Sequence, residues 1–121
     1  MGYTQEKGQY AEELACKFLK QQGLSCLNKN YHCRYGEIDL IMKQDSTIVF
    51  VEVRYRKADS LVDSVTSIDL QKQRKLYRSA ENYLQQKKIP DSIPARFDVI
   101  AITQRAKADP VIDWIKNAIE G

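Results

Sequence analysis

Two short apolar segments, each with an acidic residue inside it, constrain the fold of this chain most. Gly36-Glu37-Ile38-Asp39-Leu40-Ile41-Met42 and Ile48-Val49-Phe50-Val51-Glu52-Val53-Arg54-Tyr55 both have the composition of a strand, and the polar residues 43–47 between them predict a hairpin. Because side chains alternate along a strand, Asp39 and Glu52 are each expected on a face that also carries large apolar residues.

The pairing of these two strands is open to two registers. A turn centred on Gln44–Asp45 pairs Asp39 with Phe50 and leaves Glu52 diagonal to Asp39. A shift of two residues puts Asp39 directly opposite Glu52. Either register leaves the two carboxylates roughly 5–8 Å apart. Like charges in an apolar setting are costly unless a positive charge lies between them, and a divalent metal ion would supply that charge.

An amphipathic helix is predicted before the hairpin. Between Thr4 and Gln22 the apolar residues follow the i, i+3, i+4, i+7 spacing of a helical stripe, and Gly23 stops the pattern. Of the two adjacent acids on this helix, Glu12 lies at the edge of the stripe and Glu13 points into water. Only Glu12 is therefore placed to lean towards the core.

A second helix is predicted from a capping residue at Ser67 to about Lys88. Its stripe includes Leu76, and Lys72 falls on the same face, whereas Arg74 faces out. A lysine on the core side of a helix indicates a partner carboxylate nearby.

Shorter segments complete the predicted order of elements. Leu24–Asn30 is expected as an edge strand, followed by a polar connection at residues 30–35 that exposes His32. A polar loop is expected at residues 56–66. After the second helix, we expect a strand at residues 96–102 and a short closing segment at residues 111–115. Within the last strand, Asp98 is expected to pair with Arg96 or with the second helix. The order α-β-β-β-α-β predicts an α/β fold with a mixed central sheet flanked by helices, in one domain over residues 1–121.

Composition narrows the class of protein without choosing a partner. The chain is 43% hydrophobic and 29% charged, with a formal net charge of +3, which permits an anionic partner but does not predict one. Three cysteines without a C-x-x-C motif indicate a reduced protein, and Cys26, His32 and Cys33 lack a fourth zinc ligand at a usual spacing. With no apolar run of membrane-span length and no signal-peptide pattern, we expect a cytoplasmic protein without membrane contact.

The acids and their surroundings resemble those of a known nuclease superfamily. An acid on a helix, an acid on one strand and Glu-x-basic on its partner strand, here Glu12, Asp39 and Glu52-Val53-Arg54, resemble the PD-(D/E)xK superfamily and its Holliday-junction-resolvase-like branch. The chain is most similar to the small bacterial YraN family. The matching segments cover most of the chain in order: residues 8–12, Asn30-Tyr31, residues 36–41, residues 50–54, residues 71–74 and residues 96–99.

This resemblance implies a restriction-endonuclease-like fold and metal-dependent cleavage of phosphodiester bonds in DNA, in branched or single-stranded forms. Asp39, Glu52, the carbonyl of Val53 and Glu12 would hold Mg²⁺ or Mn²⁺, which stabilises charge on the phosphate and activates water. Resolvase-type relatives also imply a homodimer.

The chain departs from the superfamily pattern at the position of the catalytic lysine, which is Arg54. Arginine stays protonated and can bind phosphate, but it cannot act as a general base. Two alternatives are open. Lys72 supplies the ammonium group from the second helix, or Arg54 suffices because a hydroxide on the metal needs no lysine base. A further departure is Ile38, where the motif has proline.

Basic residues are expected to form a phosphate-binding rim around the acids. They are Arg34, Arg56, Lys57, Arg74, Lys75 and Arg78. Two other hypotheses stay open. The chain is a non-catalytic nucleic-acid-binding module with a degenerate nuclease site, or the acids only form a buried ionic network with Arg54, Lys72 or Arg96 in a structural domain.

Overall fold

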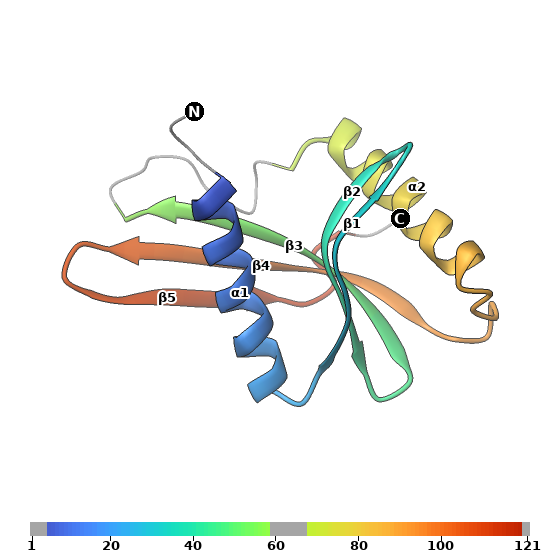
Figure 1. The fold of residues 1–121 in the computed structure, drawn as a ribbon, viewed down its shortest axis with the longest axis horizontal. Coiled ribbons are helices and arrows are strands. Elements are labelled where there is room, and N and C mark those ends of the chain that lie inside the picture. The colour runs from blue at the N-terminus through green and yellow to red at the C-terminus, as the bar shows by residue number, and fades with distance from the viewer. Residues whose placement is uncertain (1–4, 59–67, 120–121) are drawn as a thin grey trace.

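The computed structural model describes residues 5–58 and 68–119, which form one mixed α/β fold (Figure 1). The elements, in order, are α1 (Gln5–Gln21), β1 (Ser25–Cys33), β2 (Gly36–Gln44), β3 (Thr47–Lys57), α2 (Leu70–Gln86), β4 (Ala95–Arg105) and β5 (Ala108–Ile115). Within these residues the strands form a 5-stranded sheet in the order β1-β2-β3-β4-β5. Only the β3–β4 pair among them is parallel. The predicted restriction-endonuclease-like architecture is confirmed.

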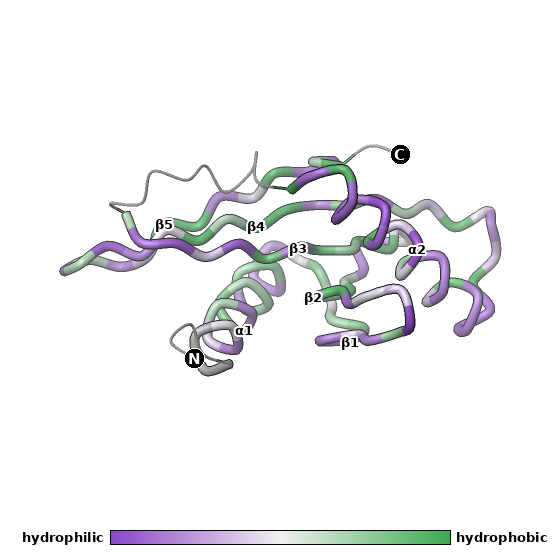
Figure 2. Tube along the Cα trace, turned by 90° about the horizontal axis from the view of Figure 1, so that it is seen from above, coloured by the Kyte–Doolittle hydropathy of each residue, from purple (hydrophilic) through white to green (hydrophobic). Residues whose placement is uncertain are grey.

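The two helices cover opposite faces of the sheet. Ala15 and Leu19 of α1 pack against a cluster that contains Val51 of β3, whereas Tyr83 of α2 packs with the neighbouring Phe50. Because neighbouring residues of a strand point to opposite faces, these two clusters are separate layers of core. Figure 2 shows the hydrophobic central parts of β3 and β4 between the layers and a largely hydrophilic β4–β5 hairpin end.

The β2–β3 hairpin adopts the second of the two predicted registers. Gln44 pairs with Thr47, so the turn is centred on Asp45–Ser46 and the alternative centred on Gln44–Asp45 is wrong. Asp45 has a φ of 54°, a left-handed conformation that aspartate tolerates better than most residues. The paired residues end at Leu40 and Val51. Asp39 and Glu52 therefore lie opposite each other, one step beyond the end of the ladder.

Strand β1 is longer than expected, because residues 31–33 continue it instead of forming a connection. Tyr31 is 8% exposed and pairs with Ile38 of β2, and its ring meets that of Tyr83 edge to face at 5.2 Å. Burial of this aromatic ring favours the extended strand over the polar loop that its neighbours suggest. His32 is exposed, as expected, but it lies on β1 rather than in a loop.

The N-cap of helix α2 lies two residues after the predicted cap. Asp69 is the N-cap, and its Oδ1 accepts a 2.8 Å hydrogen bond from the backbone N–H of Lys72. The predicted cap, Ser67, and residues 59–66 of the predicted loop lie outside the described residues, whereas residues 56 and 57 belong to β3. Lys72 is half-buried and Arg74 exposed, so the predicted faces of this helix are confirmed.

The closing segment at residues 111–115 is not a tail but part of β5. Ile112 pairs with Ile102 and Trp114 with Ile100 on β4, and both side chains pack against the α1 side of the core. The alternation of Ile112 and Trp114 with exposed Val111 and Asp113 is the period-2 pattern of a strand with one face buried. Neither helix in the described part of the chain has the length and apolar character needed to cross a membrane.

Candidate active site

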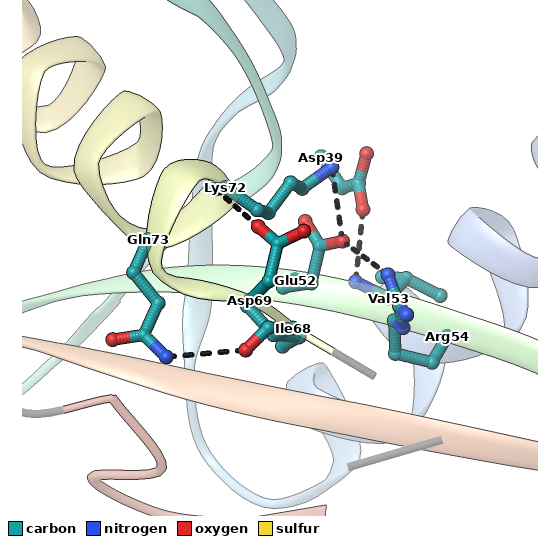
Figure 3. Close-up of polar contacts among 8 residues, drawn as sticks. All are labelled: Asp39, Glu52, Val53, Arg54, Ile68, Asp69, Lys72 and Gln73. Atoms are coloured by element: carbon teal, nitrogen blue, oxygen red, sulfur yellow. Dashed lines mark hydrogen bonds and ion pairs between the residues drawn. The ribbon is translucent and has the colours of Figure 1, made fainter. Parts of the chain in front are cut away.

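Asp39 and Glu52 lie together where β2 and β3 stop pairing. The Oδ2 of Asp39 accepts a 2.8 Å hydrogen bond from the backbone N–H of Val53. This bond takes the place of a ladder bond, so the carboxylate sits in the gap between the separating strands (Figure 3). The side chain of Glu52 is 6% exposed, which makes it a nearly buried acid beside a second acid.

Two cationic side chains contact the same oxygen of Glu52. Its Oε2 lies 3.3 Å from Nη1 of Arg54 and 3.4 Å from Nζ of Lys72. Figure 3 shows Lys72 extending from the first turn of α2 and Arg54 from the same strand as Glu52. The ammonium group of Lys72 contacts Glu52, while 41% of the side chain is exposed to solvent. The partner carboxylate that the sequence predicts for Lys72 is therefore Glu52.

The environment of Asp39 disfavours its charged form. Burial and, next, the charge of Glu52 raise the pKa of Asp39 to about 8, against the opposing effects of the Val53 N–H and Lys72. At neutral pH, Asp39 therefore holds a proton unless a further positive charge is bound. A carboxyl group in this state can accept a cation and release its proton.

Glu12 of α1 lies beside Asp39 and Glu52. It is half-buried while Glu13 is exposed, as predicted. Burial raises the pKa of Glu12, and hydrogen bonds with the side chains of Asn30 and Asp39 oppose that rise. Asn30 is a site residue that sequence reasoning missed. The segment Asn30-Tyr31 is one of those that carry the family resemblance, but the resemblance does not give Asn30 a role in the site.

The oxygens at this site suit a hard divalent cation but do not form a complete cage. Across residues 5–58 and 68–119, no three His, Cys, Asp or Glu side chains are gathered closely enough to hold a metal ion by themselves. Mg²⁺ commonly uses one or two carboxylates and takes its remaining ligands from water and substrate phosphates. Asp39 and Glu52 fit that incomplete type of site, and Glu12 lies beside them.

Residues 11–102 match the model of a family described as "Uncharacterised protein family UPF0102". The chain belongs to this family. The matched range contains the acids and both cations of the candidate site, and the UPF0102 match confirms the resemblance to the YraN family.

UPF0102 proteins of several bacteria are similar to this chain over nearly its whole length. One from Coxiella burnetii is 47% identical over 117 residues, which are 97% of this chain and 94% of the relative. One from Legionella pneumophila is 44% identical over 117 residues, 97% of each. One from Pseudomonas aeruginosa is 45% identical over 118 residues, 97% of this chain and 94% of the relative.

The basic residues predicted to bind nucleic acid lie on three parts of this UPF0102 chain. Arg34 is exposed in the β1–β2 turn, where its guanidinium lies 5.0 Å from the centre of the Tyr35 ring. Arg56 and Lys57 end β3. The remaining residues are exposed on α2: Arg74, Lys75 and Arg78. The α2 residues share the helix with Lys72, so they extend the positive charge outward from Glu52.

Arg96 pairs with Asp98 and not with the acids of the candidate site. Its Nε lies 3.0 Å from Oδ1 of Asp98, which is fully buried. The carboxylate of Asp98 also accepts hydrogen bonds from the indole of Trp114 at 2.9 Å and from the backbone N–H of Asn117 at 3.0 Å. The prediction that Asp98 pairs with Arg96 is confirmed. Asp98 joins the end of β5 to β4.

Proposed function

We propose that this chain is a divalent-metal-dependent nuclease that hydrolyses phosphodiester bonds in DNA, in branched or single-stranded forms. The observation that carries the proposal is the facing pair Asp39 and Glu52 at the point where two central strands separate. A buried pair of acids destabilises a fold unless cations are bound between or beside them, so stability alone is a poor reason to keep it.

The reaction adds water across one P–O ester bond. The water oxygen bonds to phosphorus, the ester bond breaks, and the departing oxygen gains a proton while the water loses one. A bound Mg²⁺ or Mn²⁺ would supply charge stabilisation and lower the pKa of water. Asp39 and Glu52 would hold that ion together with the carbonyl of Val53, and Glu12 would orient water from the α1 side.

Lys72 supports the migrated-lysine alternative for the missing motif lysine. Its Nζ lies 3.4 Å from Glu52 and its side chain is 41% exposed, so it can contact a phosphate without leaving the acid. Arg54 contacts the same oxygen at 3.3 Å and carries a permanent positive charge that attracts phosphate. In the proposed mechanism, Lys72 and Arg54 bind the scissile phosphate beside the acids that would hold the metal.

One observation favours a second candidate, a non-catalytic nucleic-acid-binding module. Oε2 of Glu52 already has two cationic neighbours, Arg54 and Lys72, which neutralise it without a metal. In that case the basic residues of α2 and β3 bind DNA and no bond is broken.

Cleavage and metal binding together separate the two candidates. Branched, single-stranded and duplex DNA are incubated with the protein in Mg²⁺, Mn²⁺ or a chelator, with RNA of the same sequences alongside. In parallel, calorimetry measures metal binding by the wild type and by an Asp39→Asn, Glu52→Gln double variant, each with and without DNA. We expect metal-dependent cleavage and metal binding that the double variant loses. DNA binding that persists in the chelator, without cleavage in either metal, would favour the binding module.

A further inference from the structure

A cavity of about 380 Å³ lies between the β1–β2 turn and the first half of α2. This volume falls within the range of about 300–1,000 Å³ seen for small-ligand pockets. Side chains of mixed chemistry line it: His32, Cys33, Glu37, Lys72, Lys75 and Leu76. The proposed mechanism uses only one of them, Lys72.

The cavity depends on a close approach of the turn to the helix. Gly36 also lines it, with a φ of 149°, a conformation that favours glycine. A Cβ at this position would lie 3.5 Å from Oγ of Ser79 and 3.6 Å from Cβ of Lys75. The β2 end of the turn therefore rests directly on α2, and side chains of β1, β2 and α2 form the walls of the cavity around this contact.

One wall of the cavity suits a phosphate. Lys72 and Lys75 are separated by three positions on α2, so their side chains are neighbours on the helix surface. Nζ of Lys72 also contacts Glu52 at 3.4 Å. A phosphate bound by these two lysines is therefore adjacent to the acids that would hold the metal.

The opposite wall suits a nucleobase rather than a second phosphate of the nucleic-acid backbone. Glu37 places a carboxylate there, which repels phosphate but accepts hydrogen bonds from base N–H groups. Its Oε1 lies 3.3 Å from Nδ1 of His32, and its side chain is 55% exposed, so the carboxylate is accessible to a ligand. Leu76, which is 3% exposed, closes the cavity towards the core with an apolar side chain.

We propose that this cavity binds one unpaired nucleotide next to the scissile phosphate, so that the substrate is DNA with an unpaired base at the cleavage position. The inference rests on the proposed nuclease function and adds the substrate class. A paired base is held in the stack and cannot enter a concave site, whereas an unpaired base enters at little cost. Its Watson–Crick edge meets Glu37, and its phosphate meets Lys72 and Lys75.

Protection of Cys33 from alkylation tests the cavity without requiring cleavage. The protein is treated with iodoacetamide in a chelator, alone or with a saturating DNA duplex that is either fully paired or carries one unpaired nucleotide. Mass spectrometry follows alkylation of each cysteine. Cys26 is the internal control, because it is also partly exposed but lies against the α1 side of the core. We expect the unpaired nucleotide to slow alkylation of Cys33 at least about tenfold and leave Cys26 unchanged.

Variants extend the same test. Glu37→Gln is expected to lower the affinity for the duplex with the unpaired nucleotide at least about fivefold, whereas Asp45→Asn, at the other end of β2, leaves it unchanged. Equal protection of Cys33 by both duplexes, or by neither, would overturn the cavity inference. Stronger protection by an RNA of the same design would overturn its assignment to DNA.

The two proposals fail separately in this design. Selective protection of Cys33 with no cleavage in Mg²⁺ or Mn²⁺ refutes the nuclease and supports the cavity. Metal-dependent cleavage without selective protection supports the nuclease and refutes the cavity.

Discussion

The carboxylate of Asp39 accepts the backbone N–H of Val53 at 2.8 Å, immediately beyond the last paired residues of β2 and β3. Where the hairpin opens, a side-chain hydrogen bond thus replaces the backbone hydrogen bonds of the ladder. This relationship holds Asp39 opposite Glu52 and leaves the second oxygen of Asp39 pointing away from Val53, as Figure 3 shows. The position of Asp39 therefore depends on a bond that asparagine can also accept.

Replacement of Asp39 separates its chemical role from its structural role. Asp39→Asn keeps an acceptor for the Val53 N–H but removes the charge. We expect cleavage to fall at least about 100-fold. The free energy of unfolding should equal or exceed that of the wild type at neutral pH, because the wild type must take up a proton at Asp39 to fold and asparagine needs none. Nuclease assays and urea denaturation measure the two effects. An unfolded or fully active variant would contradict this role.

Stability is expected to depend on pH through Asp39. Its pKa rises from 3.8 to about 8 on folding, so the folded state binds this proton more tightly than the unfolded state does. The contribution of Asp39 to stability is therefore fully present below about pH 4 and is lost as the pH rises towards 8. Urea denaturation at pH 5 and pH 8 should show a larger advantage of Asp39→Asn over the wild type at pH 8. Parallel pH profiles would disprove the link.

Addition of Mg²⁺ at pH 8 should recover the stability that the wild type loses, because the ion supplies the missing positive charge. The Asp39→Asn, Glu52→Gln double variant should gain nothing from the ion. The midpoint of thermal unfolding, with and without Mg²⁺, gives both results. An equal gain in both proteins would place the ion elsewhere.

Lys72 and Arg74 form a matched pair, because both are cations near the start of α2 but only Lys72 contacts Glu52. Lys72→Ala should reduce cleavage about 100-fold, whereas Arg74→Ala should change it less than about tenfold. Steady-state kinetics on one DNA substrate measure both variants. Equal losses would count against Lys72 as the migrated lysine.

Asp98 is expected to matter for stability and not for metal binding. Asp98→Ala leaves Arg96 without its buried partner and removes acceptors from Trp114 and Asn117, so the free energy of unfolding should fall by about 3–5 kcal/mol. The exposed Asp113 is the control, and Asp113→Ala should cost less than about 0.5 kcal/mol. Trp114 is the only tryptophan, so its fluorescence reports unfolding directly. A loss of metal affinity in folded Asp98→Ala would contradict the separation.

The exposed cations of α2 should govern the salt dependence of DNA binding. Replacing Arg74 and Arg78 by alanine should reduce the slope of log affinity against log salt by about 0.7–0.9 for each phosphate contact removed. Lys17 and Lys20, exposed on α1 on the other face of the sheet, are the controls and should leave the slope unchanged. Fluorescence anisotropy over a salt series measures the slopes. Equal changes in both pairs would mean that the binding is diffuse.

Patterns that depend on local periodicity were predictable from the sequence. The stripe on α1 placed Glu12 inward and Glu13 outward, and the stripe on α2 placed Lys72 inward, as the structure has them. The sequence permits two hairpin registers, because the choice depends on a turn of two residues. The left-handed conformation of Asp45, which a run of polar residues does not reveal, selects it.

Features that depend on distant parts of the chain were not predictable. Residues 31–33 have the polarity of a loop, and β1 extends through them because Tyr31 meets Tyr83 of α2. Residues 111–115 are predicted only as a short closing segment, because the inner face of β5 is covered only once α1 is in place, with Phe18 against Trp114. The contact of Glu12 with Asn30 joins α1 to β1, so the spacing of residues along the chain does not predict it.

The parallel pairing of β3 with β4 has a consequence for the growing chain. In the finished sheet β3 is a central strand, but its neighbour on one side, residues 95–105, follows only after the whole of α2. During synthesis, β3 therefore emerges as an unpaired apolar edge and stays so until β4 leaves the ribosome. An edge of this kind recruits other strands. The acids that break the apolar runs of β2 and β3, Asp39 and Glu52, thus also act as charges that discourage aggregation before any site exists.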